Sequence, residues 1–281
     1  MDTRPILFLD SGLGCLPYGH FFHSQNRNER LVCIGDRANF PYGPKSREEV
    51  IKILDSLTDS IFSFYNPKIL ALVCNTASVS GLDFLREKYP EIPIVGTVPA
   101  VKPAVLASRT RRIGVIGTER TVDDPYIKKL AERYGSDCEI MGIGAPELVD
   151  FAQKQYWSST SAERLSVITR YVEKFRSAGA DSIVLSCTHF LLLRDDFLAA
   201  SGSDITVYDS VEGVCRRVKS ILDRDDRKLR ACGDMQGAGT GNGVVPQIAV
   251  TGSGALEPYW EPLAFHFGFT QKIGDGPKTA V

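Results

Sequence analysis

The chain has 281 residues, of which 43% are hydrophobic and 24% are charged. This composition excludes a disordered chain, a collagen and a coiled coil, and the length predicts one or two domains whose core needs no disulfide or metal for stability. Lys and Arg total 33 and Asp and Glu total 34, which leaves a net charge of −1. The chain as a whole therefore lacks the basic excess of a nucleic-acid-binding protein.

Short apolar runs and reduced cysteines predict a cytoplasmic protein without membrane contact. The first apolar run, 6–9, is too short for the core of a signal peptide, which needs about 7–15 residues. No uninterrupted apolar stretch approaches the ~18 residues that span a bilayer. The seven cysteines are odd in number and form no C-x-x-C pair. That pattern indicates neither a disulfide framework nor a zinc site, and we expect no metal.

Strand-like and helical segments alternate along the chain. Short Ile-, Val- and Leu-rich runs without polar alternation are typical of strands that are buried on both faces of a parallel sheet. They occur at 6–9, 31–34, 69–73, 94–95, 113–116, 183–185 and 205–208. Helical patterns lie between them, at about 46–64, 77–88, 121–133, 162–177 and 210–222. This alternation predicts an α/β fold of the doubly wound type.

Capping residues mark three helix starts. Ser46 followed by Glu49 forms an S-x-x-E capping box. Ser161 is expected to start the next long helix without an acidic partner at the third position. Pro125 is expected in the first turn of a helix that opens near Val122, where its missing N–H costs nothing.

A glycine-rich segment, 231–243, interrupts the pattern. It follows no strand and lacks the G-x-G-x-x-G order, so it predicts a flexible surface loop and not a nucleotide site. A strand at 247–251 and a final helix near 256–266 are expected after it.

Several strands end in small polar residues, and this signature repeats. Asp10 and Cys74 end two strands in the first half, 64 residues apart, while Thr118 and Cys187 do so in the second half, 69 residues apart. The chain therefore reads as two copies of one α/β unit. Ligands of open α/β sheets bind at the carboxyl ends of the strands. Two facing units would place Cys74 and Cys187 on opposite walls of one cleft.

Two opposed cysteines at helix starts indicate a specific chemistry. A helix N-terminus is expected to lower the pKa of each thiol, and Asp10 and His189 would tune Cys74 and Cys187 respectively. One thiolate would remove an α-proton while the other thiol delivers a proton to the opposite face, which inverts the stereocentre. The side chains expected to bind a substrate carboxylate are those of Ser11, Asn75, Thr76 and Thr188. The alternative is that both cysteines are buried strand ends followed by helix caps.

At these residues the chain resembles the cofactor-independent aspartate/glutamate racemase family. The resemblance covers about residues 5–222 and follows the family's order. It is carried by DSGLG (10–14), GDRANFPYGPKS (35–46), CNTAS (74–78), IPIVGTVPAVKPA (92–104), IGVIGTERTVDDPY (113–126), PELV (146–149), SCTHF (186–190) and VYDS (207–210).

The resemblance implies two similar doubly wound domains with mainly parallel sheets that face each other across a cleft. The first would comprise 1–98 plus 210–281 and the second 99–209. The resemblance implies no cofactor, neither pyridoxal phosphate nor a nucleotide. In family terms Cys74 works on the D-substrate and Cys187 on the L-substrate, assisted by Asp10 and His189. It further implies nearby support from Asp36 and a set of substrate-binding residues: Ser11, Tyr42, Gly43, Asn75, Thr76, Thr118, Thr121 and Thr188.

The motifs favour glutamate as the substrate. The family's glutamate enzymes carry P-Y-G after the second strand and C-T-H at the second cysteine, as here at 41–43 and 187–189. The implied function is the supply of D-glutamate for peptidoglycan. Glutamate is the only binding partner that the motifs imply, and the sequence leaves open whether the protein is a homodimer. Two alternatives remain. The first is another enzyme on the same fold, either a racemase of aspartate or hydantoin or an arylmalonate-type decarboxylase. The second is an amino-acid-binding regulatory protein with weakened catalysis.

Departures from the family pattern surround the site. Cys15, Ser186 and Phe190 stand at flanking positions where the family usually has other residues. Gln153 stands where the family has a Glu that supports the histidine. An amide cannot accept a proton as a carboxylate does, so we expect His189 to lack a carboxylate neighbour.

Overall fold

The computed structural model describes residues 2–224, 244–270 and 273–275, and it contains two parallel sheets. The first has the strand order β10-β9-β2-β1-β3-β4 and the second the order β6-β5-β7-β8. The strands of the first sheet are β1 (Ile6–Asp10), β2 (Leu31–Gly35), β3 (Ile69–Leu72), β4 (Ile94–Gly96), β9 (Gln247–Val250) and β10 (Gly274–Asp275). Those of the second are β5 (Arg112–Gly117), β6 (Glu139–Gly144), β7 (Ser182–Ser186) and β8 (Thr206–Tyr208).

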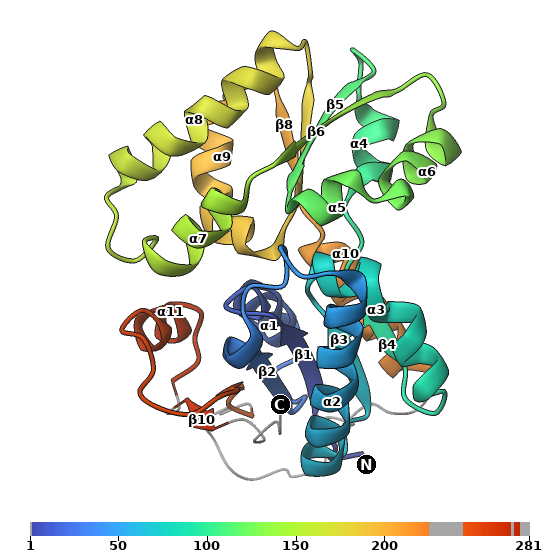
Figure 1. Cartoon of the computed structure of the whole chain (residues 1–281), viewed down its shortest axis with the longest axis vertical. Helices are drawn as coiled ribbons and strands as arrows, with labels where there is room; N and C mark the ends of the chain where they lie inside the picture. The colour runs from blue at the N-terminus through green and yellow to red at the C-terminus, as the bar shows by residue number, and fades with distance from the viewer. Residues whose placement is uncertain (1, 225–243, 271–272, 276–281) are drawn as a thin grey trace, which may run out of the picture.

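Helices cover both faces of each sheet, and the two halves are stacked along the long axis of the molecule (Figure 1). Around the first sheet lie α1 (Cys15–Gln25), α2 (Arg47–Tyr65), α3 (Asn75–Lys88), α10 (Val211–Arg224) and α11 (Trp260–His266). Around the second lie α4 (Val101–Ala107), α5 (Glu119–Asp123), α6 (Pro125–Tyr134), α7 (Pro146–Lys154), α8 (Ser161–Ser177) and α9 (Arg194–Ser201). Two 3-10 helices follow β2 and β7, at Arg37–Asn39 and Thr188–Leu193.

Alternate residues of β1 pack against different helices, as expected for a strand buried on both faces. Leu7 and Leu9 belong to the cluster that contains α2 and α3, whereas Ile6 and Phe8 belong to the cluster that contains α1, α10 and α11. The cluster that contains α1, α10 and α11 continues into the other half of the molecule, where it includes Phe175 of α8. One continuous core therefore joins the two halves.

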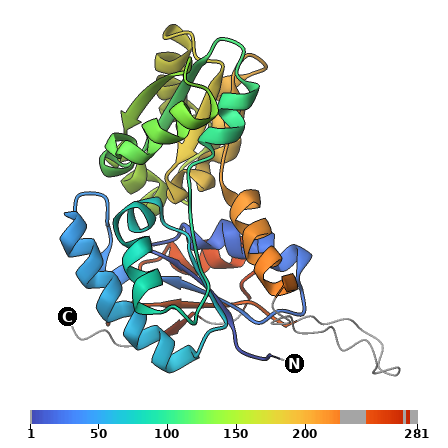
Figure 2. The same cartoon turned by 90° about the vertical axis from the view of Figure 1, so that its right-hand side faces the viewer.

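The internal repeat predicted from the sequence is confirmed by the strand order. In each half the first four strands of that half lie in the spatial order second, first, third, fourth, and every pair of neighbouring strands is parallel. β9 and β10 extend the first sheet beyond β2. The chain crosses between the halves after β4 and returns after β8 (Figure 2). The predicted domain bounds, 1–98 with 210–281 and 99–209, stay a prediction.

Most predicted elements are present, with instructive exceptions. β6 was not predicted because it is a half-exposed edge strand without an apolar run. The single helix expected at 121–133 is two helices, because Asp124 ends α5 and caps α6 with Pro125 in its first turn. The helices α1, α4, α7 and α9 were also missed. The glycine-rich segment 231–243 lies outside the described residues.

The start of α8 differs from the prediction by one residue. Ser161 is not the cap: Thr160 is, and with Glu163 it forms a complete capping box. The capping box predicted at Ser46 is present as well.

Replacement of Thr160 by alanine tests the value of this cap. The variant loses the acceptor for the Glu163 backbone N–H, so we expect the free energy of unfolding to fall by about 1 kcal/mol. Denaturant unfolding checks the value. Thr169→Ala is a suitable control, because the half-buried Thr169 donates its hydroxyl hydrogen bond back to the Leu165 backbone oxygen within the same helix.

Candidate active site

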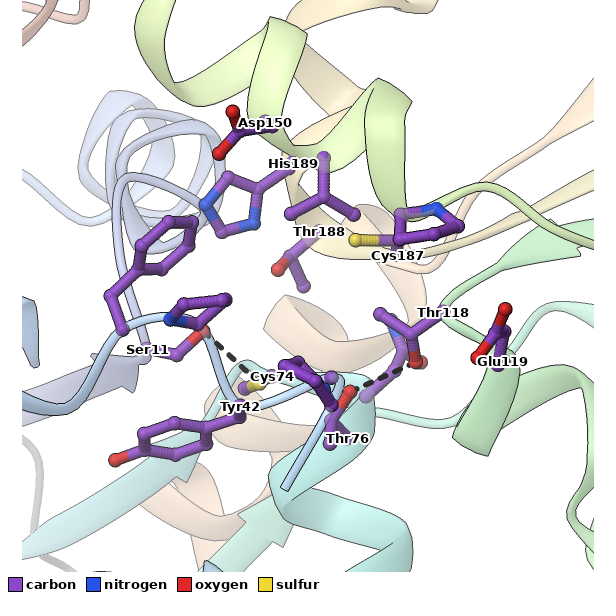
Figure 3. Close-up of a pocket in the computed structure, with 17 residues that line it drawn as sticks. Ser11, Tyr42, Cys74, Thr76, Thr118, Glu119, Asp150, Cys187, Thr188 and His189 are labelled. Atoms are coloured by element: carbon purple, nitrogen blue, oxygen red, sulfur yellow. Dashed lines mark hydrogen bonds between the residues drawn. The ribbon is translucent and has the colours of Figure 1, made fainter.

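A pocket lies where the carboxyl ends of the strands from both sheets meet. It is a cavity of about 130 Å³. A cavity of about 150 Å³ holds a molecule the size of benzene, so this pocket suits a small metabolite. Seventeen residues line it: Ser11, Phe40, Pro41, Tyr42, Gly43, Pro44, Cys74, Asn75, Thr76, Thr118, Glu119, Pro146, Val149, Asp150, Cys187, Thr188 and His189 (Figure 3).

Cys74 stands between β3 and α3 as the N-terminal cap of the helix. Its side chain is 5% exposed, and its Sγ lies 3.7 Å from the Ser11 Oγ. Burial raises the pKa of the Cys74 thiol to about 12, and the charge of Asp10 acts in the same direction. The backbone N–H of Ala77 and the Ser11 hydroxyl act in the opposite direction.

Cys187 occupies the equivalent place in the second half, between β7 and the 3-10 helix Thr188–Leu193. It is 6% exposed and comes from the wall opposite Cys74 (Figure 3). Burial raises the pKa of the Cys187 thiol well above its usual value, although the backbone N–H groups of His189 and Phe190 lower it. The prediction that helix N-termini lower the pKa of both thiols is therefore wrong, because desolvation outweighs the helix ends.

Asp10 lies behind the pocket and connects the two halves. Its carboxylate accepts hydrogen bonds from the backbone N–H groups of Gly12 (2.7 Å) and Gly14 (3.1 Å), and from the hydroxyl of Thr188 (2.8 Å). The residue is 1% exposed and does not line the pocket. Burial raises the pKa of Asp10, while His189 and the three donors lower it.

Gly14 allows this close approach of the two halves. A Cβ at this position would lie 2.3 Å from the Oγ1 and 2.6 Å from the Cβ of Thr188. The DSGLG motif therefore has a packing role beside its polar residues.

His189 is buried against Gln153, as the sequence alignment at PELV predicts. Its Nε2 lies 2.8 Å from the Gln153 Oε1, and both residues are 2% exposed. The pKa of His189 is lowered by burial, which Asp10 partly offsets. The Phe40 ring packs against the imidazole at a centroid distance of 5.4 Å.

Three threonine hydroxyls form a chain across the cleft. The Thr76 and Thr118 hydroxyl oxygens are 3.0 Å apart (Figure 3). Those of Thr118 and Thr121 are 2.9 Å apart. Thr76 and Thr118 line the pocket, but Thr121 is fully buried behind Thr118. Thr121 was predicted to bind substrate; in this structure it orients Thr118 instead.

Tyr42 and Asp36 form a second supporting pair. The Tyr42 hydroxyl points away from the pocket and donates to the Asp36 carboxylate at 2.6 Å (Figure 3). Tyr42 therefore offers the pocket its ring and backbone. Asp36 is fully buried and does not line the cavity, so it supports Tyr42 from behind. The neighbouring Gly43 approaches Thr118 closely, since a Cβ there would lie 3.2 Å from the Thr118 Cγ2.

Asn75 is the pocket residue with unused hydrogen-bonding capacity. It is 3% exposed, and neither its Oδ1 nor its Nδ2 has a partner in the described part of the chain. A buried amide without partners is costly, so it indicates a place for a polar ligand.

The lining also contains two carboxylates outside the predicted set of site residues. Glu119 follows Thr118 in the first turn of α5, and Asp150 lies three residues before Gln153 on α7. The helical spacing of Asp150 and Gln153 could have indicated that both face the same side.

Comparison with known proteins agrees with this geometry. Residues 25–218 match the model of a family described as Asp/Glu/Hydantoin racemase. A glutamate racemase of Treponema pallidum is 37% identical over 210 residues, which are 75% of this chain and 78% of the relative. One from Sphingopyxis alaskensis is also 37% identical, over 78% of this chain and 82% of the relative.

Solved structures show the same fold over nearly the whole chain. Escherichia coli glutamate racemase, in complex with L-glutamate and the activator UDP-MurNAc-ala, matches with a TM-score of 0.78 and 25% identity, over 99% of this chain and 100% of that one. The Francisella tularensis enzyme in complex with D-glutamate has a TM-score of 0.76 at 20% identity, over 100% and 98% of the two chains. The matched span and the identity to these relatives place the chain in the Asp/Glu/hydantoin racemase family.

Proposed function

We propose that this chain interconverts L- and D-glutamate without a cofactor, by two-base catalysis at Cys74 and Cys187. The observation that carries the proposal is the symmetry of the two thiols. Each follows the third strand of a repeated unit, and both line one buried cavity from opposite halves. The relatives named above are glutamate racemases, and this supports glutamate over the other substrates of the family.

The proposed reaction moves one proton off the α-carbon and another onto its opposite face. With L-glutamate, the Cys187 thiolate takes the α-proton, so that a C–H bond breaks and an S–H bond forms. The electron pair is left on the α-carbon and spreads into the neighbouring carboxylate. The Cys74 thiol then donates its proton to the other face and becomes a thiolate. The D-substrate follows the reverse path, starting at Cys74.

Ionisation of a buried thiol is the electrostatic cost of this mechanism. Burial raises the pKa of both thiols, so the thiolate needs stabilisation inside the pocket. Backbone N–H groups provide part of it, that of Ala77 at Cys74 and that of His189 at Cys187. The substrate ammonium adds a positive charge to a cavity whose lining contains no Lys or Arg among the described residues. We infer that substrate binding itself favours the thiolate.

The hydroxyl and amide groups of the lining would hold the substrate carboxylates. Asn75 has both amide atoms free within the described chain, and Ser11 and Thr76 lie on the same side. The Thr188 hydroxyl donates to Asp10, so it offers the substrate only an acceptor, which suits the ammonium. A homodimer was left open by the sequence and stays a hypothesis. No helix within residues 2–224, 244–270 and 273–275 has the length and apolar character needed to cross a membrane.

Isotope exchange during turnover tests the proposal. Incubation with L-glutamate in D₂O, without added cofactor, should yield D-glutamate that carries deuterium at the α-carbon. L-Aspartate, a hydantoin and an arylmalonate, assayed in parallel, should react far more slowly. A binding protein without catalysis would give neither exchange nor inversion. Faster turnover of aspartate, or release of CO₂ from the malonate, would assign one of the alternatives instead.

A further inference from the structure

The segment 251–260 follows the part of the chain that the family model matches, which ends at residue 218. It is nevertheless fixed to the first half at several points. The Thr251 hydroxyl donates to Asp36, and the Arg37 guanidinium donates to the backbone oxygens of Ser253 and Ala255. Trp260 is fully buried, and its ring packs so closely on Gly35 that a Cβ on Gly35 would lie 2.6 Å from the nearest ring atom.

From this anchored position the segment reaches the other half of the molecule. The Gln153 Nε2, on α7, donates to the Tyr259 hydroxyl at 3.4 Å. The Gln153 Oε1 accepts the backbone N–H of Leu13 at 3.3 Å. The Leu13 contact identifies the amide oxygen, because only an oxygen can accept from the Leu13 N–H, and the Tyr259 hydroxyl then accepts from the amide nitrogen.

The orientation of the amide decides the protonation of His189. Since the Gln153 Oε1 faces the His189 Nε2 at 2.8 Å, the imidazole must donate from Nε2. The neutral ring then has its lone pair on Nδ1, which has no hydrogen-bond partner in the described part of the protein. Gln153 does not line the pocket whereas His189 does.

We propose that segment 251–260 is a positioning element of the active site, which acts through Tyr259 and Gln153 to fix the His189 tautomer with its proton on Nε2 and its Nδ1 free toward the pocket. This proposal deepens the proposed racemase function and rests on it for the catalytic consequence. A bare Nδ1 can accept a proton from a thiol or a bound substrate, whereas a protonated Nδ1 cannot. Tyr259 and Gln153 are positioning residues, because neither lines the cavity.

The surroundings of His189 leave this tautomer as the main neutral form. Its titratable neighbours are Asp10 at the end of β1, Asp150 on α7, Cys187 beside it, Cys74 across the cavity, and Tyr259 beyond Gln153. Burial holds the pKa of His189 below its usual value, and Asp10 is the group whose charge opposes this. Burial therefore favours the neutral ring, and the tautomer of that neutral ring is what the amide controls.

The first test is ¹⁵N NMR of the imidazole side chains in the substrate-free protein, which is independent of activity. The chain has only four histidines, and a His189→Asn spectrum identifies the signals of His189. We expect wild-type His189 to carry its proton on Nε2 alone. Gln153→Glu places a carboxylate against Nε2, so the pKa of His189 should rise by about one to three pH units. A wild-type proton on Nδ1 would overturn the proposal.

Tyr259→Phe tests the role of the segment itself. The variant removes the acceptor of the Gln153 Nε2, so the amide can rotate; we expect a mixture of His189 tautomers, a severalfold lower kcat and a KM within about twofold of wild type. Tyr156→Phe is the matched control, because Tyr156 is a half-buried tyrosine just after α7 whose hydroxyl makes no hydrogen bond with a described residue. Gln155→Glu is the control for charge, since it adds a carboxylate at the exposed end of α7.

The outcomes separate this proposal from the proposed function. Thermal melting shows whether each variant is folded. A Tyr259→Phe protein that keeps one tautomer and the wild-type kcat would refute the role of the segment, whatever the substrate is. A wild-type protein that racemises no amino acid would refute the proposed function, while the NMR result would still decide the control of the tautomer.

Discussion

Serine at Cys74 or at Cys187 should abolish the inversion of glutamate while the protein remains folded. Each sulfur is proposed to exchange a proton with one face of the α-carbon, and a hydroxyl is far less acidic and less easily ionised than a thiol. We expect kcat to fall by several orders of magnitude in either variant, as it does when a catalytic group is removed. Cys215→Ser is the matched control, because Cys215 is also buried, with its Sγ near the Tyr18 backbone oxygen and away from the pocket.

The two serine variants should also differ from each other in a diagnostic way. In D₂O, Cys187→Ser retains the Cys74 thiol and should slowly exchange the α-proton of D-glutamate without inverting it. Cys74→Ser should do the same with L-glutamate only. NMR of each enantiomer after incubation measures both exchange and inversion. Full inversion in either variant would contradict two-base catalysis, and loss of activity in Cys215→Ser would show that serine substitution acts through packing.

Asp10 lies behind the pocket, so it would support proton transfer through Thr188 and His189. Replacement of Asp10 by asparagine should lower kcat by about two to four orders of magnitude, the range expected when acid–base catalysis is disrupted. The geometry should survive, because an amide oxygen can still accept from Gly12 and Gly14 while the amide nitrogen can donate to Thr188. What disappears is the buried charge that influences Cys74 and His189. Steady-state kinetics in both directions measures the loss.

The same Asp10→Asn variant should be at least as stable as wild type at neutral and alkaline pH. Burial raises the pKa of Asp10 in the folded state above its unfolded value of about 3.8. Between these two pKa values the folded state binds more protons than the unfolded state, so the free energy of unfolding of the wild type falls as the pH rises. An asparagine side chain does not titrate, so the variant should lack this loss. Denaturant unfolding at several pH values checks it: a variant that is less stable than wild type at pH 8 but not at pH 4 would contradict the sign.

Taken together, these effects describe a site in which stability and function oppose each other. Asp10, Cys74, Cys187 and His189 are all buried, and burial disfavours the charged form of each. A charged substrate that enters the pocket changes this balance. Buried groups with perturbed pKa values are typical of catalytic sites, since a desolvated base is reactive once it is ionised.

The sequence determined the architecture because its strongest signals are local. Apolar runs without alternation identified nearly all the strands of the two sheets, and a polar residue at the end of four of them located the site. Those signals suffice because parallel strands bring their carboxyl ends to one edge. Asp10, Cys74, Thr118 and Cys187 lie at strand ends, as the sequence predicts, and all but Asp10 line the pocket. β6 was not predicted, because an edge strand needs no continuous apolar run.

Only the tertiary structure decided how the predicted residues are used. The resemblance implied that Thr121 binds the substrate, yet Thr121 lies behind the pocket, because the direction of a side chain depends on packing. The sign of the thiol pKa shifts was predicted from helix ends, whereas burial, which depends on every neighbouring chain segment, reversed it. The contact between Tyr259 and Gln153 joins residues 106 positions apart. No local pattern encodes such a contact; it arises when the chain returns from the second half to complete the first sheet.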